Sequence, residues 1–250
     1  MIKAHVDALR PLAGVFSESH IPPIFCPFCM NATMAAGTIS YEESAESRRL
    51  KAQYEAEWEP DWAKGLFWTT IHCPRCKTRC SVTGDMSTAG CFSDESGLVD
   101  DYIQFFQVKF VYPALRLMNL PPETPETFIA LINEASELIW ANPDATANRI
   151  RVAIEELMTA RGMVKGKLHT RINAFRKENA DVAEYLEAVK WIGNDGSHET
   201  GLTVYDVLNG IEMLQHAIDN LYDRSHIQLA ARMRQINQDR TIKPKTEPSF

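Results

Sequence analysis

Two pairs of cysteines constrain this chain more than any other feature of its sequence. The pairs are Cys26-Pro27-Phe28-Cys29 and Cys73-Pro74-Arg75-Cys76, each with two residues between its thiols. That spacing lets both thiolates of a pair bind one metal ion, and two pairs complete the tetrahedral site that zinc prefers. We therefore expect Cys26, Cys29, Cys73 and Cys76 to hold one structural Zn2+ ion.

The two remaining cysteines are Cys80 and Cys91, and all six lie between positions 26 and 91. Cys80 stands four residues beyond Cys76 and could compete as a ligand, but a buried free thiol is the favoured role for both. A site closed by four thiolates leaves no coordination position for water. The metal is therefore expected to stabilise the fold rather than to hydrolyse a substrate.

Composition indicates an ordinary globular protein with room for two domains. Of the 250 residues 45% are apolar and 24% charged. No apolar run approaches the roughly 20 residues of a membrane helix, and the N-terminus lacks a secretion signal, so we expect a cytoplasmic protein. The net charge of −7 argues against coating nucleic acid by bulk attraction, but leaves a local basic patch open.

Sequence patterns divide the chain into four parts. We expect a zinc-ribbon domain at 1–95, a linker at 96–125, a helical bundle at 126–237 and a disordered tail at 238–250. Within the ribbon, 41–50 favours an exposed helix, and 65–71 and 79–83 read as strands on either side of the second cysteine pair. The apolar segment 99–111 fits either a strand or a buried connecting helix. The expected fold class is mainly α, with a small β zinc ribbon in front.

Apolar side chains recur at helical spacing through the C-terminal half. The stripes predict five helices, around 128–139, 150–157, 168–175, 182–189 and 204–221, the last of which could continue to 236. Short connections between amphipathic helices favour a bundle of four to five helices.

Candidate chemistry lies near the end of the fourth stripe, in the segment from Lys190 to Glu199. Asn194 and His198 stand four residues apart and could share a helical face, where a histidine can act as general acid or base. The alternative is an ordinary turn with an incidental histidine. Arg151 and Glu155 are also four apart, and their simpler interpretation is a surface ion pair.

These motifs, in order, resemble a known family. Two cysteine pairs, Asn133-Glu134-Ala135, the Arg151–Glu155 helix and Lys190-Trp191-Ile192-Gly193-Asn194 leading to Ser197-His198 look like the domain-of-unknown-function family forty-one forty-five. The resemblance covers roughly residues 105–225 for the bundle, with the cysteine pairs as a looser match. That family is grouped with HEPN-like helical bundles, which often form homodimers. Many are metal-independent endoribonucleases of bacterial defence systems.

The resemblance implies an RNA- or nucleotide-directed protein, with His198 and Asn194 at the histidine end of the family motif. Gly193 stands where the family's arginine is expected, so Lys190 or Arg151 would have to supply the positive charge. An endoribonuclease and a non-catalytic descendant both stay open. The alternative is a zinc-ribbon adaptor that binds a protein or nucleic-acid partner, with Trp58 and Trp62 as an anchor.

Overall fold

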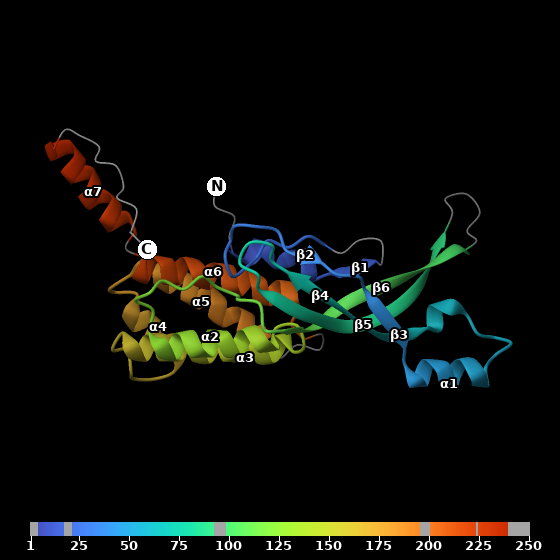
Figure 1. Cartoon of the computed structure of the whole chain (residues 1–250). Helices are drawn as coiled ribbons and strands as arrows, with labels where there is room; N and C mark the ends of the chain where they lie inside the picture. Colours follow the sequence, from blue (N-terminus) through green and yellow to red (C-terminus); the bar gives the residue numbers. More distant parts are fainter. Residues whose placement is uncertain (1–4, 18–21, 93–98, 196–200, 224, 240–250) are drawn as a thin grey trace.

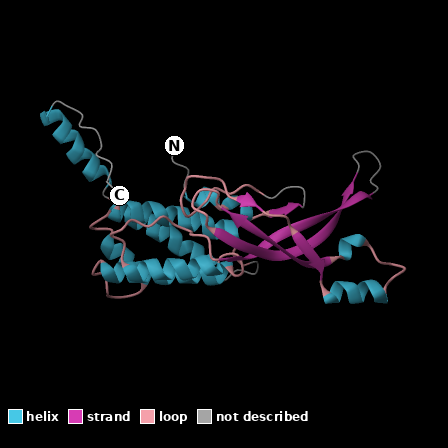
Figure 2. Ribbon diagram, viewed as in Figure 1, coloured by secondary structure: helices cyan, strands magenta, loops and turns pink. Residues whose placement is uncertain are grey.

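A curled antiparallel sheet fills one end of the molecule and helices fill the other (Figure 1). The computed structural model describes residues 5–17, 22–92, 99–195, 201–223 and 225–239. Figure 2 shows this arrangement, in which the helix at 45–53 is the exception because it lies at the sheet end. The strands are β1 (Val15–Ser17), β2 (Ala35–Ala36), β3 (Ser40–Glu43), β4 (Lys64–His72), β5 (Arg79–Phe92) and β6 (Val99–Tyr112). Their order is β1-β6-β5-β4-β2, and β3 also pairs with β4.

Alternating side chains give the sheet one buried and one open face. Along β4, Phe67 and Ile71 are buried while Trp68 is exposed, as a strand with one face on the core requires. On the buried face the ring of Phe67 lies 5.1 Å from that of Phe106 and 5.8 Å from that of Phe16. These aromatic rings come from three strands, so they fix how the strands pack inside the curl.

A β-bulge bends the long pairing of β5 with β6. The register shifts between Thr83 and Gly84, where Gly84 pairs with Val108 rather than Lys109. A Cβ atom on Gly84 would lie 1.9 Å from the carbonyl oxygen of Gln107, so only glycine fits there. The bulge increases the local twist and thereby helps the sheet to curl.

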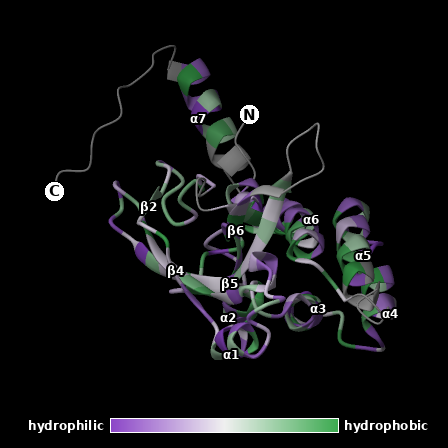
Figure 3. Cartoon of the chain, turned by 90° about the vertical axis from the view of Figure 1, so that its right-hand side faces the viewer, coloured by the Kyte–Doolittle hydropathy of each residue, from purple (hydrophilic) through white to green (hydrophobic). Residues whose placement is uncertain are grey.

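The helices show the amphipathic pattern and the capping that their sequence demands. They are α1 (Ala45–Gln53), α2 (Glu126–Leu138), α3 (Pro143–Ala160), α4 (Leu168–Phe175), α5 (Ala180–Asp195), α6 (Val204–Tyr222) and α7 (Ser225–Asp239). Figure 3 shows hydrophobic and hydrophilic residues on different sides of α5 and α6. Asn142 caps α3 directly before Pro143, and Thr203 and Asp206 form a capping box on α6.

The N-terminal segment joins the two ends of the molecule. It forms two short 3-10 helices, η1 (His5–Ala8) and η2 (Arg10–Leu12); a third, η3 (Pro60–Trp62), precedes β4. The guanidinium of Arg10 donates to Asn209 at 2.8 Å and to Glu212 at 2.7 Å, both on α6. The core runs without a break from these helices through the sheet to α6, so sheet and helices share one interior.

The expected fold class, a mainly α protein with a small zinc ribbon, is wrong. The sheet has six strands, and β5 and β6 each span 14 residues. The segment 99–112 lies wholly within the predicted linker 96–125 and is a full strand of this sheet, the first of the two alternatives left open for it. The sheet is larger than the sequence predicted because Ser87, Ala89 and Gly90 are neither β-branched nor aromatic, so this stretch does not look like a strand. They are held by pairing with β6.

Several local expectations are confirmed. Strands enter and leave the second cysteine pair, and helices occur at each of the five predicted stripes. The fifth stripe does not continue as one helix, because α6 ends at Tyr222 and α7 begins at Ser225. The four-part division into domains stays a prediction, and the expected tail at 238–250 lies almost wholly outside the described residues.

Candidate metal centre and helical site

The two cysteine loops have the same backbone geometry. In the first, the N–H of Met30 donates to the carbonyl of Cys26 at 3.0 Å. In the second, the N–H of Lys77 donates to the carbonyl of Cys73 at 3.0 Å. Met30 and Lys77 both have positive φ, at 49° and 63°. Each loop therefore turns back after its second cysteine. As a result, both thiols of the pair point to one side.

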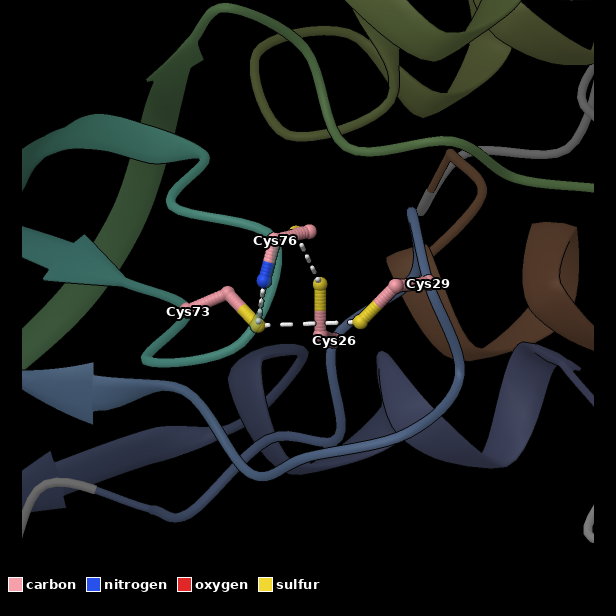
Figure 4. Close-up of side chains that lie close together, drawn as sticks. All are labelled: Cys26, Cys29, Cys73 and Cys76. Atoms are coloured by element: carbon pink, nitrogen blue, oxygen red, sulfur yellow. Dashed lines mark hydrogen bonds between the residues drawn. The ribbon is translucent and has the colours of Figure 1, made fainter. Parts of the chain in front are cut away.

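The loops bring four thiols together, as the sequence predicted (Figure 4). All four Sγ atoms lie within 4.8 Å of one another. Cys26 Sγ is 3.7 Å from Cys76 Sγ, and Cys29 Sγ is 3.6 Å from Cys73 Sγ. A tetrahedral zinc ion with Zn–S bonds of about 2.3 Å would separate its sulfurs by about 3.8 Å, whereas disulfide bonding needs about 2.05 Å. The geometry therefore fits a metal ion and excludes disulfides.

The surroundings of the thiols shift their pKa values in opposite directions. Burial raises the pKa of the Cys26 thiol to about 12, whereas a hydrogen bond with Thr78 lowers the pKa of Cys76 to about 6. A thiol like Cys26 becomes a thiolate only beside a cation, and a divalent metal supplies that charge. Cys80 lies outside the cluster as a buried free thiol, and burial raises its pKa to about 11. Cys91 is a free thiol too.

Positive side chains lie on and beside the two cysteine loops, a feature that was not predicted from the sequence. Arg75, Lys77 and Arg79 are exposed on the second loop and its flank. Arg116 is also exposed and lies 5.6 Å from the ring centre of Phe28 in the first loop. None of these four cations forms an ion pair with a described acidic side chain. The sequence could have indicated these cations, because no Asp or Glu occurs in 22–41, 64–84 and 109–122.

In the helical part, the structure pairs the predicted residues with other partners. Arg151 Nε lies 3.6 Å from Glu155 Oε1, an exposed ion pair on α3, as the simpler interpretation had it. Lys190 is buried, and its Nζ lies 2.5 Å from Glu187 Oε1. Asn194 belongs to the last turn of α5, but its side chain is not among those described. His198 lies outside the described residues, so its roles with Asn194, Lys190 and Arg151 stay predictions.

A histidine that the sequence analysis passed over lies beside Lys190. His169 Nδ1 is 3.0 Å from Glu187 Oε1 and 3.3 Å from Lys190 Nζ. The amide of Asn173 lies 2.9 Å from His169 Nε2. Burial raises the pKa of Glu187, but hydrogen bonds from Lys190 and His169 outweigh it and leave that pKa below its ordinary value. The sequence could have indicated this contact, because His169 and Asn173 are four residues apart on one helix.

The fold and site define a β-sheet protein with a cluster of four cysteines that could hold a metal ion, and a C-terminal set of helices. Residues 133–240 match a family described as Domain of unknown function (DUF4145), so the predicted family resemblance is confirmed for this part. Residues 14–111, which include the metal centre, match a second family, Domain of unknown function (DUF8608). No curated protein and no solved structure matches the chain. Among the described residues, no helix is long and apolar enough to cross a bilayer.

Proposed function

We propose that this chain is an RNA-directed binding protein whose sheet region is held together by a structural zinc ion. Four sulfurs and no other ligand type favour a soft or borderline ion, and the spacing of 3.6 and 3.7 Å suits tetrahedral Zn2+. A site filled by four thiolates has no place for a substrate oxygen. The zinc therefore acts by holding the loops of Cys26 and Cys73 in place.

One observation carries the RNA-directed role: unpaired cations gather at the metal centre of an acidic protein. The chain has a net charge of −7, yet Arg75, Lys77, Arg79 and Arg116 lie there with no ion pair to any acidic side chain in the described part of the chain. A zinc ion with four thiolates carries a formal charge of about −2, which four cations exceed. The excess positive charge at this end attracts a polyanion, and phosphate oxygens are what Arg and Lys bind best.

Cations of the helical part are used differently. Lys190 is neutralised by Glu187, and Arg151 by Glu155. Cations held in such pairs are less available to a phosphate, because a carboxylate already neutralises them. This contrast favours binding at the metal end over cleavage at the helical end.

The proposal is tested by RNA binding and zinc content together. Elemental analysis should give one zinc per chain. Fluorescence anisotropy with labelled RNA should show binding that weakens with salt, and Arg75→Gln with Arg79→Gln should lower the slope of log affinity against log salt by about 1.5. The matched control is Lys165→Gln with Lys167→Gln, which removes the same charge from exposed positions before α4. Equal losses in both double variants, or no binding by the wild-type protein, would contradict the proposal.

A metal-independent endoribonuclease at the helical part, of the HEPN-like kind, is the second candidate function. The exposed imidazole of His169, held by Glu187, favours it because a carboxylate can orient a histidine for proton transfer. Incubating the zinc-loaded protein with RNA, without added metal, should then yield 2′,3′-cyclic phosphate ends. Activity lost in both His169→Ala and His198→Ala would support this candidate. The homodimer, the cytoplasmic location and the role in bacterial defence stay predictions.

A further inference from the structure

The open face of the sheet carries exposed aromatic side chains next to the basic metal loop. Trp68 on β4 is 45% exposed, and Phe110 and Tyr112 on β6 are 58% and 81% exposed. Large aromatic rings are rarely left in water on a strand without a reason, since each loses the stabilisation that burial would give it. We call these three residues the aromatic row.

Strand register places the aromatic row on one face. Trp68 pairs with Thr83, and Thr83 pairs with Phe110, so the three side chains stand side by side across β4, β5 and β6. Two strand spacings separate Trp68 from Phe110, about 10 Å. Tyr112 follows Phe110 by two residues and pairs with Ser81. Residues two apart on a strand point the same way, so Tyr112 extends the row toward the metal loop.

The same register connects the row to the cations. Arg79 begins β5 two residues before Ser81, so its side chain shares the face of Tyr112 and lies diagonally across from it, about 7–8 Å away. Arg75 and Lys77 follow on the loop itself. Exposed aromatic rings and exposed cations therefore form one strip from Phe110 to the second cysteine loop.

We infer that this strip binds single-stranded RNA, with bases stacked on Trp68, Phe110 and Tyr112 and phosphates held by Arg79 and Arg75. The inference rests on the proposed function and adds the site and the form of the ligand. Exposed bases stack on aromatic side chains of a sheet because every base has a flat π face, whatever its sequence. Three rings fit a site of about three to four nucleotides.

The chemistry between the rings favours a single strand over other partners. Thr70, Ser81 and Thr83 lie among the aromatic residues, so the surface between the rings is polar, and the exposed Leu66 lies at its edge rather than at its centre. A duplex keeps its bases stacked inside and offers none to these rings. At the end of the strip that is farther from the cysteine loop lie two acidic residues. They are Glu42 and Asp85, and both pair with Leu66 of β4. The positive strip therefore has a defined length.

Fluorescence anisotropy with a labelled 12-nucleotide oligouridylate and its duplex with oligoadenylate tests the inference. The wild-type protein should bind the single strand more tightly than the duplex. Trp68→Ala and Phe110→Ala should each weaken single-strand binding roughly 5- to 150-fold, and Trp68→Phe should restore most of it. Trp62→Ala is the matched control, because Trp62 is 44% exposed but belongs to η3, outside the strip.

Ultraviolet crosslinking of the wild-type protein to the oligouridylate covers the case in which a variant fails to fold. Adducts on peptides that contain Trp68, Phe110 or Tyr112 support the inference. Adducts confined to other peptides overturn it, as does equal binding of single strand and duplex. If RNA binds and responds to Arg75 and Arg79 but not to the aromatic row, the proposed function stands and this inference fails. If no RNA binds at all, both fail, and a protein partner becomes the ligand to seek.

Discussion

The sheet region and the helical region are built by contacts of different range. In the sheet, Ser81 pairs with Tyr112, and the sulfurs of Cys26 and Cys76 meet from positions 50 residues apart. In the helices, the stabilising pattern repeats every three to four residues, and caps such as Thr203 with Asp206 act within one turn. The comparison teaches that the cysteine cluster lies in the region that local sequence patterns alone cannot hold together.

Charge divides the same two regions. Helical cations such as Arg149 and Arg176 pair with acidic residues of the same region, Glu134 and Glu184. Cations at the metal centre have no such partner among the described residues. At the cysteine loops four such cations lie close together, where one ligand can meet them.

The largest effect should follow from removing one metal ligand. Cys73→Ser takes away a buried thiolate, and structural zinc contributes about 10–16 kcal/mol in small zinc-binding peptides. We expect loss of zinc and a fall of more than about 3 kcal/mol in the free energy of unfolding. Hydrogen exchange should show the loss of protection in β4 and β5 first, while α3 and α6 keep theirs.

Cys91→Ser is the control for that variant, because Cys91 is a free thiol outside the metal cluster. It should keep its zinc and change the free energy of unfolding by less than about 1 kcal/mol. The contrast between regions breaks down if α3 and α6 lose protection as early as β4 and β5 in Cys73→Ser.

This difference in range also explains what could be predicted from the sequence. The cysteine spacing predicted the thiol cluster because each pair is local and the chemistry of zinc joins the pairs. Helical stripes such as Ile150, Ile154 and Leu157 predicted α3 because their period is local. The extent of β5 was missed, because Thr88 to Gly90 are held by partners on β6. The cations became visible as a patch only once the register placed Arg79 beside Tyr112.

A smaller effect should come from the partly buried charge pair of the helical region. Glu187→Gln leaves the ammonium of Lys190, whose side chain is 7% exposed, without its carboxylate, and should cost about 2 kcal/mol. Because the pKa of Glu187 is lowered in the fold, this contribution is fully present above the ordinary carboxyl pKa and is lost as pH falls through the lowered value. Urea unfolding of the wild-type protein and Glu187→Gln at pH 7 and pH 3 measures the size of this contribution and its loss at low pH.

The exposed pair of Arg151 and Glu155 gives the matched control for that measurement. Glu155→Gln should change the free energy of unfolding by less than about 0.5 kcal/mol, since exposed pairs contribute little. Similar losses in Glu155→Gln and Glu187→Gln would show that burial does not distinguish the two pairs.

Two helix caps of the same chemistry sharpen the comparison further. Thr203→Ala removes the capping box of α6, a helix with a buried face, and should lower the free energy of unfolding by about 1 kcal/mol. Ser44→Ala removes the cap of α1, where only Ser47 is buried among the helix residues, and should cost less than about 0.5 kcal/mol. Denaturant midpoints, compared at a constant m-value, measure the change in the free energy of unfolding for each variant. Equal losses would mean that α1 unfolds together with the core.

The smallest difference should come from His5, which joins the N-terminal segment to the sheet end. Burial lowers the pKa of His5; its hydrogen bond to the carbonyl of Arg116 offsets this in part, and the charge of Arg116 lowers the pKa further. Nε2 donates to that carbonyl at 2.7 Å. A histidine with a lowered pKa stabilises the fold above its unfolded value of about 6.5, and this stability is lost as pH falls through the folded value.

The wild-type protein should therefore lose stability between pH 7.5 and 5.5. His5→Gln keeps a donor for the carbonyl without a group that titrates, so its stability should fall less over this range, and parallel pH profiles would contradict this role.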